Sequence, residues 1–415
     1  MSASGATLRV GQPGTPCPDA AYSAINDAIK AASAGDVIEI CPALYAEQLT
    51  VTKPLTLRGI SVQGVNRVLI QPATAAPTVV PGAIAVITVL NTANVNIENL
   101  AIDAANNTVS GCGTTLSDIH YYNAGGTVAN NVLTGAHLSD PTSCSVLFPG
   151  NGFGVLMDKD PAVSAPLALS VQNNSITRFD RSGVLVMGTG ITADISGNNI
   201  SGIGPATGAN QFGVFLANGA VGLVTNNMIS QGNCGAIDMD TCFTLRSEGV
   251  VLRSVGDGTI IDGNSISNVQ SGIFANGANR ARITNNLVRN VDALDGIHVQ
   301  GVTNSLFVSN RIYNVGPIGP DASSNAEGCG IEEIPDTGTT GNTFVGNVVS
   351  DAFCGVAYVS SAWVDAGLYI NTLYNELNAD NYPDAFPTYL EPSAVASPPQ
   401  ASGLRRARRF RDLLK

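Results

Sequence analysis

A short phrase repeats through residues 171–359 and limits what this 415-residue chain can fold into. It pairs an Asn, one further residue and an aliphatic residue with a later Gly that precedes Ile or Val. The Asn phrases begin at Asn174, Asn198, Asn227, Asn264, Asn286, Asn310 and Asn347, and the Gly phrases begin at Gly183, Gly213, Gly249, Gly272, Gly296, Gly330 and Gly355. Repeats of roughly 22 to 37 residues, built from β-favouring segments and turn residues, are typical of a solenoid.

Such short segments cannot bury an apolar face alone, so successive coils must stack as parallel strands about 4.8 Å apart. The predicted fold is a parallel β-helix. An Asn at one turn position of each coil can take the left-handed backbone conformation and hydrogen-bond to its copies above and below. Asn99 is a candidate first member of this ladder.

The Asn ladder and the Gly-Ile/Val strands resemble the right-handed parallel β-helices of the pectin lyase-like superfamily over about residues 35–370. The resemblance implies an all-β, single-stranded, right-handed parallel β-helix. It implies no single reaction, because that superfamily includes lyases, hydrolases, esterases, epimerases, tailspikes and non-catalytic surface proteins. Residues 36–59 are similar to the opening coils of pectin methylesterases, but the later Gln-Asp-Thr, Asp-Phe-Ile-Phe-Gly and Gly-Arg-Pro-Trp motifs of those enzymes do not occur in this chain.

The pattern divides the chain into four predicted segments. Residues 1–35 hold a strand and a helix that caps the β-helix, because an uncapped end coil would expose apolar core and unpaired strand edges. Residues 36–377 form the β-helix, residues 378–403 a Pro/Ala/Ser-rich extension, and residues 404–415 a basic helix or tail. This tail could anchor the chain to a membrane or partner, or pack against the acidic body.

The charge distribution favours some partners over others. The formal net charge is −12, and it becomes −17 without residues 404–415, which hold six of the 20 basic residues and one of the 32 acidic ones. A nucleic-acid partner is therefore disfavoured. A neutral glycan suits such a body better than a polyanionic one, unless cations bridge the charges.

The eight cysteines fall into sequential pairs without a metal-binding Cys-x-x-Cys spacing. The predicted disulfides are Cys17–Cys41, Cys112–Cys144, Cys234–Cys242 and Cys329–Cys354. Disulfides indicate an oxidising compartment, so we expect a secreted, periplasmic or cell-surface protein. Residues 1–5 do not read as a signal peptide, which suggests a mature or trimmed form, and no apolar run of 18 residues predicts a transmembrane segment.

Alternate residues of a strand point to opposite faces, so alignment on the strand Gly separates inward from outward positions. The residue after Gly is β-branched in every coil and is predicted to point inward. The second and fourth residues after Gly should then form one exposed strip, apolar in its N-terminal part and polar in the middle. Its predicted substrate-binding residues are Phe215, Phe274, Asn276 and Gln300.

Several ionisable residues on or beside this strip are catalytic candidates. Glu332, with His298 one coil below, could act as acid or base, because an adjacent imidazole can stabilise its ionised form. Glu248 and Asp295, two coils and thus about 9.6 Å apart, approach the spacing of about 6.5–9.5 Å between the carboxyl groups of an inverting glycosidase. Arg253 is the outward candidate for a lyase base.

Three interpretations of these residues stay open. We expect a secreted β-helix that binds and cleaves an extracellular polysaccharide, with hydrolysis preferred over elimination. The acids near Glu332, including Glu327, Glu333 and Asp336, could instead chelate Ca²⁺ through hard oxygen ligands, although no metal site can be assigned. The rival class is a non-catalytic surface or assembly module, forming homo-oligomers through the apolar strip or the basic tail.

Overall fold

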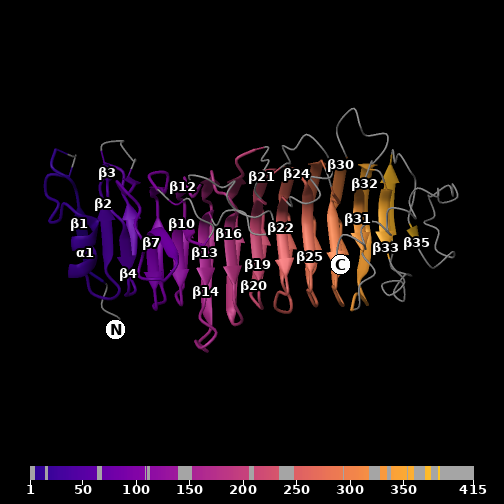
Figure 1. Cartoon of the computed structure of the whole chain (residues 1–415), viewed down its shortest axis with the longest axis horizontal. Helices are drawn as coiled ribbons and strands as arrows, with labels where there is room; N and C mark the ends of the chain where they lie inside the picture. The colour runs from indigo at the N-terminus through magenta and orange to yellow at the C-terminus, as the bar shows by residue number, and fades with distance from the viewer. Residues whose placement is uncertain are drawn as a thin grey trace. The chain divides into compact units, whose positions relative to one another are not determined.

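The computed structural model describes residues 5–14, 17–62, 68–107, 109, 113–138, 152–204, 210–232, 247–292, 294–316, 328–333, 338–352, 354–358, 370–374 and 382–383. The chain divides into two compact units. Unit 1 comprises Met1–Ile203 and Gly208–Met228, and unit 2 comprises Gly204–Thr207 and Ile229–Lys415. Each unit is a stack of parallel strands that falls into three columns, named here in the order in which the chain passes through them (Figure 1).

In unit 1 every strand pairs in parallel with its equivalent in the next coil. The first column contains β1 (Thr7–Val10), β2 (Val37–Ile40), β5 (Thr56–Gly59), β8 (Val95–Glu98), β11 (Gly126–Ala129), β14 (Leu167–Gln172), β17 (Ile191–Ser196) and β20 (Val221–Thr225). The second contains β3 (Leu44–Tyr45), β6 (Leu69–Ile70), β9 (Ala101–Asp103), β12 (Val132–Thr134), β15 (Ser175–Thr177) and β18 (Asn199–Ser201). The third contains β4 (Leu49–Val51), β7 (Ala83–Leu90), β10 (Thr115–Tyr122), β13 (Gly152–Asp158), β16 (Ser182–Met187) and β19 (Phe212–Ala217).

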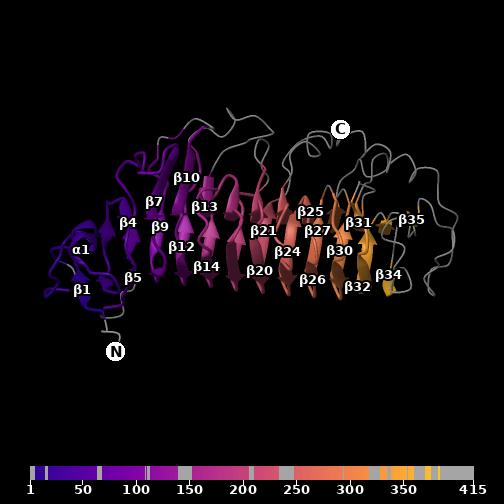
Figure 2. The ribbon, with the colours of Figure 1, turned by 90° about the horizontal axis from the view of Figure 1, so that it is seen from below.

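Unit 2 repeats this pattern, and β21 (Met228–Gly232) begins at the last residue of unit 1. Its first column contains β23 (Ile260–Asp262), β26 (Arg282–Thr284), β29 (Leu306–Val308) and the first part of β32 (Thr343–Ala352). The second contains β24 (Ser265–Val269), β27 (Leu287–Val291), β30 (Arg311–Val315), the rest of β32 and β34 (Ile370–Tyr374). The third contains β22 (Glu248–Arg253), β25 (Ser271–Asn276), β28 (Ile297–Gln300), β31 (Cys329–Glu333), β33 (Cys354–Tyr358) and β35 (Tyr382–Pro383) (Figure 2).

The predicted Asn ladder is present in both units. In unit 1 it runs through Asn131, Asn174, Asn198 and Asn227. In unit 2 it runs through Asn264, Asn286, Asn310 and Asn347. In each adjacent pair, the side-chain oxygen of the later Asn accepts both the backbone N–H and the side-chain amide of the earlier one, at 3.0–3.1 Å in the Asn286–Asn310 pair. These bonds satisfy polar groups inside the core, where an unpaired group would be costly.

Two details of the ladder prediction are wrong. The ladder Asn does not take the left-handed conformation; the residue before it does, as at Asn130 (φ 57°) and Asn173 (φ 54°). Asn99 is one of these turn residues (φ 58°), so it is not a ladder member. The backbone N–H of Leu100, the next residue, donates to Asn131, which is the first ladder Asn of unit 1.

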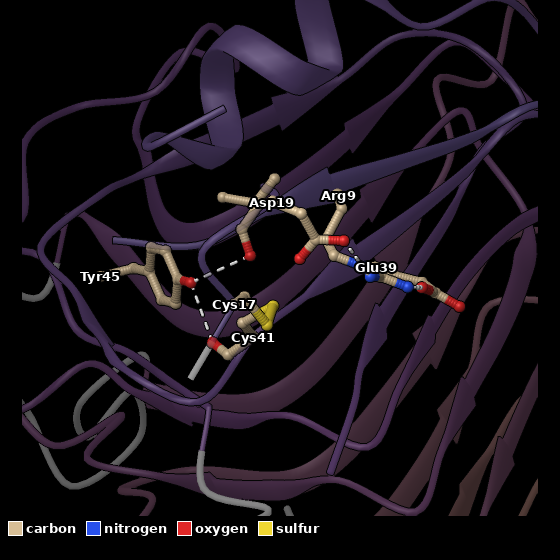
Figure 3. The surroundings of a disulfide bond; sticks show 7 residues. Arg9, Cys17, Asp19, Glu39, Cys41 and Tyr45 are labelled. Atoms are coloured by element: carbon tan, nitrogen blue, oxygen red, sulfur yellow. Dashed lines mark hydrogen bonds and ion pairs between the residues drawn. A yellow bond between two sulfur atoms is a disulfide. The ribbon is translucent and has the colours of Figure 1, made fainter. Parts of the chain in front are cut away.

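The helix predicted within residues 1–35 is α1 (Ile25–Ala31), a helix of seven residues beside β1, β2 and β4. Next to it the Cys17–Cys41 disulfide joins the first two coils, with 6.4 Å between Cα atoms (Figure 3). Tyr45 lies in the same interior and donates its hydroxyl to the Cys41 carbonyl at 2.9 Å, and burial raises the pKa of Tyr45 to about 12. One of the four predicted disulfides is therefore confirmed, while the capping role of α1 stays a prediction.

The structure describes only some of the cysteines in the other three predicted pairs. Cys329 is disulfide-bonded, and Cys354 is its Cα partner in the register of β31 and β33, as predicted. Cys112, Cys144, Cys234 and Cys242 lie outside the described residues, as do the basic segment 404–415 and, apart from residues 382–383, the predicted extension 378–403. In the described part of the chain, no helix has the length and apolar character that crossing a bilayer requires.

Candidate functional site

The third column carries the strand Gly residues on which the sequence prediction was aligned. The residue after Gly is fully buried wherever it is described, as predicted: Val155, Val184, Val214, Val250, Ile273, Ile297 and Ile331. Gly itself is required at this position, because other atoms approach it closely. A Cβ at Gly296 would lie 2.4 Å from Ile312 Cγ2 and 2.6 Å from the Gly330 carbonyl oxygen, which is too close for any side chain.

The predicted exposed strip is wrong for most of its second residues after Gly, which are buried, whereas the fourth residue is half-buried or exposed at Asp158, Met187, Arg253, Asn276 and Gln300. The second residue after Gly is at most 7% exposed at Leu156, Leu185, Val251, Phe274, His298 and Glu332. In unit 1, Leu156 and Leu185 form an apolar cluster with Phe153, and Met187 and Phe215 pack against it half-buried. The alternation of faces was correct, but outward on a strand did not mean exposed to solvent.

In unit 2 this buried face brings together Asp295, His298 and Glu332, which we call the Asp–His–Glu cluster. His298 and Glu332 are Cα partners on β28 and β31, and Asp295 lies just before β28. The His298 Nδ1 atom is 2.9 Å from Asp295 Oδ2 and 3.6 Å from Glu332 Oε2. Because a carboxylate only accepts, the His298 Nδ1–H donates to Asp295.

Neighbouring groups fix the orientation of the cluster. The second oxygen of Asp295, Oδ1, accepts the backbone N–H of Cys329 at 2.9 Å, so the carboxylate is held from both sides. The Phe274 ring lies one coil below His298, with 5.0 Å between the ring centroids and 42° between the planes. These contacts limit rotation of the carboxylate and the imidazole before any ligand arrives, which favours a functional centre over a pair of mobile surface acids.

The cluster has two chemical uses. One ligand atom from each residue lies within 4.8 Å of the others, and among the described residues this is the group whose geometry could hold a metal ion. Alternatively, the two carboxyl groups and the imidazole could exchange protons with a substrate. The sequence predicted the Glu332–His298 contact, but it paired Asp295 with Glu248 instead.

The remaining predicted residues are placed near the cluster or apart from it. Glu248 is buried at the start of β22, next to Ser271 rather than within the cluster. Arg253 is exposed at the end of β22. Asn276 and Gln300 are half-buried Cα partners whose side chains hydrogen-bond at 2.9 Å. Phe215 belongs to unit 1, where its ring packs edge-to-face on Phe212.

Glu333, the third residue after the strand Gly330, points into the core. It is 2% exposed and pairs in register with the buried Val299. Its carboxylate accepts the Asn342 amide at 2.9 Å, which offsets part of the cost of burying it. The predicted calcium ligands Glu327 and Asp336 lie outside the described residues.

Unit 1 contains a contact between a histidine and an aspartate that the sequence interpretation missed. His120 Nε2 lies 2.6 Å from Asp158 Oδ1, and the ring contacts Tyr122 edge-to-face. His120 is the Cα partner of Leu156, so it occupies the same outward position as His298. The signal was hidden because Asp118 stands where later coils have the strand Gly, and an alignment on Gly therefore skipped this coil.

Comparisons with known proteins address the fold. A family model described as "Right handed beta helix region" matches residues 246–371. No curated protein matches the chain.

Among solved structures, a lacto-N-biosidase of family GH136 from Eubacterium ramulus is similar over 89% of this chain and 67% of its own, at 11% identity and a TM-score of 0.52. The A-module of a mannuronan C-5 epimerase from Azotobacter vinelandii (90% and 94% coverage, 13% identity, TM-score 0.48) and the Dettilon tailspike protein (89% and 68%, 14%, 0.49) are also similar. The family-model match and the likeness to the lacto-N-biosidase confirm the right-handed parallel β-helix fold that the resemblance to the pectin lyase-like superfamily implied.

Proposed function

We propose that this protein binds and cleaves an extracellular polysaccharide at the Asp–His–Glu cluster of unit 2. The observation that carries the proposal is the convergence of two carboxylates and one imidazole from adjacent coils, held by a backbone N–H and an aromatic ring. The similar lacto-N-biosidase is named for an action on a glycan, but a shared fold leaves the reaction open. The Cys17–Cys41 disulfide supports an oxidising, extracellular or periplasmic location.

Hydrolysis is the preferred reaction, with Asp295 and Glu332 as the carboxyl pair. Their nearest oxygens lie within 4.8 Å, which is closer to the separation of about 5–5.5 Å in retaining glycosidases than to the wider inverting one. In that scheme Asp295, oriented by His298 and Cys329, attacks the anomeric carbon, and Glu332 donates a proton to the leaving oxygen. A water then attacks the glycosyl-enzyme, and Glu332 takes its proton.

A neutral glycan is the preferred substrate class, because the net charge of −12 opposes a polyuronate chain. Elimination is the alternative reaction, with the exposed Arg253 as base beside a cation. The two reactions leave different products. Hydrolysis yields only new reducing ends, whereas elimination also yields an unsaturated sugar that absorbs near 235 nm.

The test is a screen of neutral and acidic polysaccharides, with and without Ca²⁺, that follows both reducing ends and absorbance. We expect reducing ends without absorbance, and a loss of at least about 100-fold in Glu332→Gln, the range of a missing acid–base group. Glu248→Gln distinguishes the Asp295–Glu332 pair from the Glu248–Asp295 pair. A loss of activity in this variant would favour the Glu248–Asp295 pair and an inverting reaction. Activity that survives Glu332→Gln and Asp295→Asn would overturn the proposal, and silence across the panel would favour a non-catalytic surface module.

A further inference from the structure

We propose that the Asp–His–Glu cluster also binds one divalent transition-metal ion, with Zn²⁺ as the best fit. The ligand atoms come from Asp295, His298 and Glu332, all at most 7% exposed. The binding site itself does not depend on the proposed reaction, whereas its effect on cleavage does.

The spacing of these atoms suits a small ion. Around an ion with bonds of about 2.0–2.2 Å, neighbouring ligand atoms lie about 3–3.5 Å apart. The two distances from His298 Nδ1, 2.9 Å to Asp295 and 3.6 Å to Glu332, bracket that range. The ion would replace the proton that the imidazole now shares with Asp295, and the two carboxylate oxygens, which lie within 4.8 Å of each other, would move toward it.

The charges in the cluster also favour a divalent ion. Two carboxylates within 4.8 Å of each other repel, and burial makes that repulsion stronger than in water. The imidazole supplies at most one positive charge. An M²⁺ ion would balance both carboxylates while leaving the imidazole as a neutral ligand.

The surroundings act as an outer shell for the ligands. The Cys329 backbone N–H holds Asp295 Oδ1 and leaves Oδ2 facing the imidazole. Phe274 packs against the imidazole. Such outer contacts orient metal ligands and strengthen binding, commonly by about 10- to 100-fold.

The ligand chemistry selects the class of ion. Ca²⁺ prefers six to eight oxygen ligands, so one imidazole with two carboxylates is a poor match. Zn²⁺ binds imidazole and carboxylate in sets of three protein ligands with an open position, and Co²⁺ accepts the same ligands. For this cluster we therefore propose a transition-metal ion in place of the Ca²⁺ that the acid-rich sequence suggested.

The test uses the full chain without a histidine tag, because the sequence has only three histidines. Co²⁺ is titrated into the metal-free protein and followed by visible absorption, and Zn²⁺ stoichiometry is measured by elemental analysis after dialysis. We expect one ion per chain, and at least about 100-fold weaker binding in His298→Gln, because losing a ligand should exceed the loss of an outer contact. The matched control is His120→Gln, which removes the histidine at the same position of unit 1 and should leave the affinity unchanged.

Binding that is equal in His298→Gln and the wild type, or lost equally in the His120→Gln control, would overturn the proposal. If His298→Gln does not fold, X-ray absorption at the zinc edge of the wild type decides. One imidazole with oxygen ligands supports the site, while sulfur or two imidazoles contradict it.

The consequence for cleavage separates the two proposals. A bound ion occupies the carboxylate oxygens that hydrolysis requires, so we expect Zn²⁺ to inhibit reducing-end release. Stoichiometric binding without cleavage of any glycan would leave the metal site and overturn the proposed function. If the protein binds no ion and Zn²⁺ does not change its cleavage of a glycan, the metal site would be overturned and the proposed function would stand.

Discussion

Units 1 and 2 place a histidine at the same position of the third column, but they surround it differently. His120 contacts one carboxylate, that of Asp158 on the next coil. The Cα partners of His120 on the neighbouring strands are Thr88 and Leu156. His298 meets Asp295 in its own coil and Glu332 in the next. The fold supplies the same position in every coil, and the residues on the neighbouring coils decide how many ionisable groups meet there.

The sharpest way to break this comparison is to remove one carboxylate from each unit. Asp295→Asn should lower the rate of glycan cleavage by at least about 100-fold, because it removes a reacting carboxylate. Asp158→Asn should leave the rate unchanged, since His120 has no second carboxylate beside it among its described contacts. Initial rates of reducing-end release check both. Equal losses would mean that unit 1 holds the reacting groups, or shares them.

The ladders give the opposite expectation, because they are alike in the two units. Asn310→Ala and Asn198→Ala each remove an amide that bonds to neighbours above and below and to a backbone carbonyl. Each should cost about 2–4 kcal/mol, since several buried polar groups lose partners at once. Urea unfolding followed by circular dichroism measures the cost. A much smaller value in one unit would show that its ladder is not equivalent.

Asp118 offers a smaller effect, at the coil where unit 1 departs from the Gly pattern. Burial, with a contribution from Asp103, raises the pKa of Asp118 well above its usual range. A raised carboxyl pKa costs no stability below the unfolded pKa, and the cost grows as pH rises above it. Asp118→Asn should therefore stabilise the protein at pH 7 by about 1–3 kcal/mol, and less at pH 4.

Thermal unfolding at the two pH values checks this expectation. Asp103→Asn is the control, because it removes the neighbouring charge but leaves Asp118 buried, so it should recover only part of the gain. A loss of stability in Asp118→Asn at pH 7 would show that the carboxylate is needed there.

His137 should give the smallest effect. A hydrogen bond to the buried Asp180 raises the pKa of the half-exposed His137 imidazole. The stabilisation is present below the unfolded pKa and is lost as pH rises through the raised folded pKa. His137→Gln should cost roughly 0.5 kcal/mol at pH 5, because solvent screens an exposed pair, and nothing at pH 9. A cost that does not change with pH would indicate packing instead.

The sequence predicted the scaffold better than the site. The β-helix, the inward column after Gly and the ladder follow from backbone hydrogen bonding and period-two alternation, which repeat in every coil. The burial of Glu332 and Phe274 could not be predicted this way, because strand alternation gives the face of a side chain and not what covers that face. The Asp295–His298 contact depends on the path of the chain before β28, which has no repeating signal. His120 was missed because Asp118 occupies the strand-Gly position of its coil, and the alignment on Gly therefore left that coil out.

The close packing around the strand Gly also determines where the chain can change length. The residues that join the second column to the third differ greatly in number between coils, with Thr134 to Gly152 and Val315 to Cys329 among the longest spans. At the strand Gly, in contrast, there is no room for even one methyl group. New segments can therefore enter beside the face that holds Asp295, His298 and Glu332 without changing the register of any strand. A designer could therefore exchange the joining segments and keep the strands of the scaffold intact.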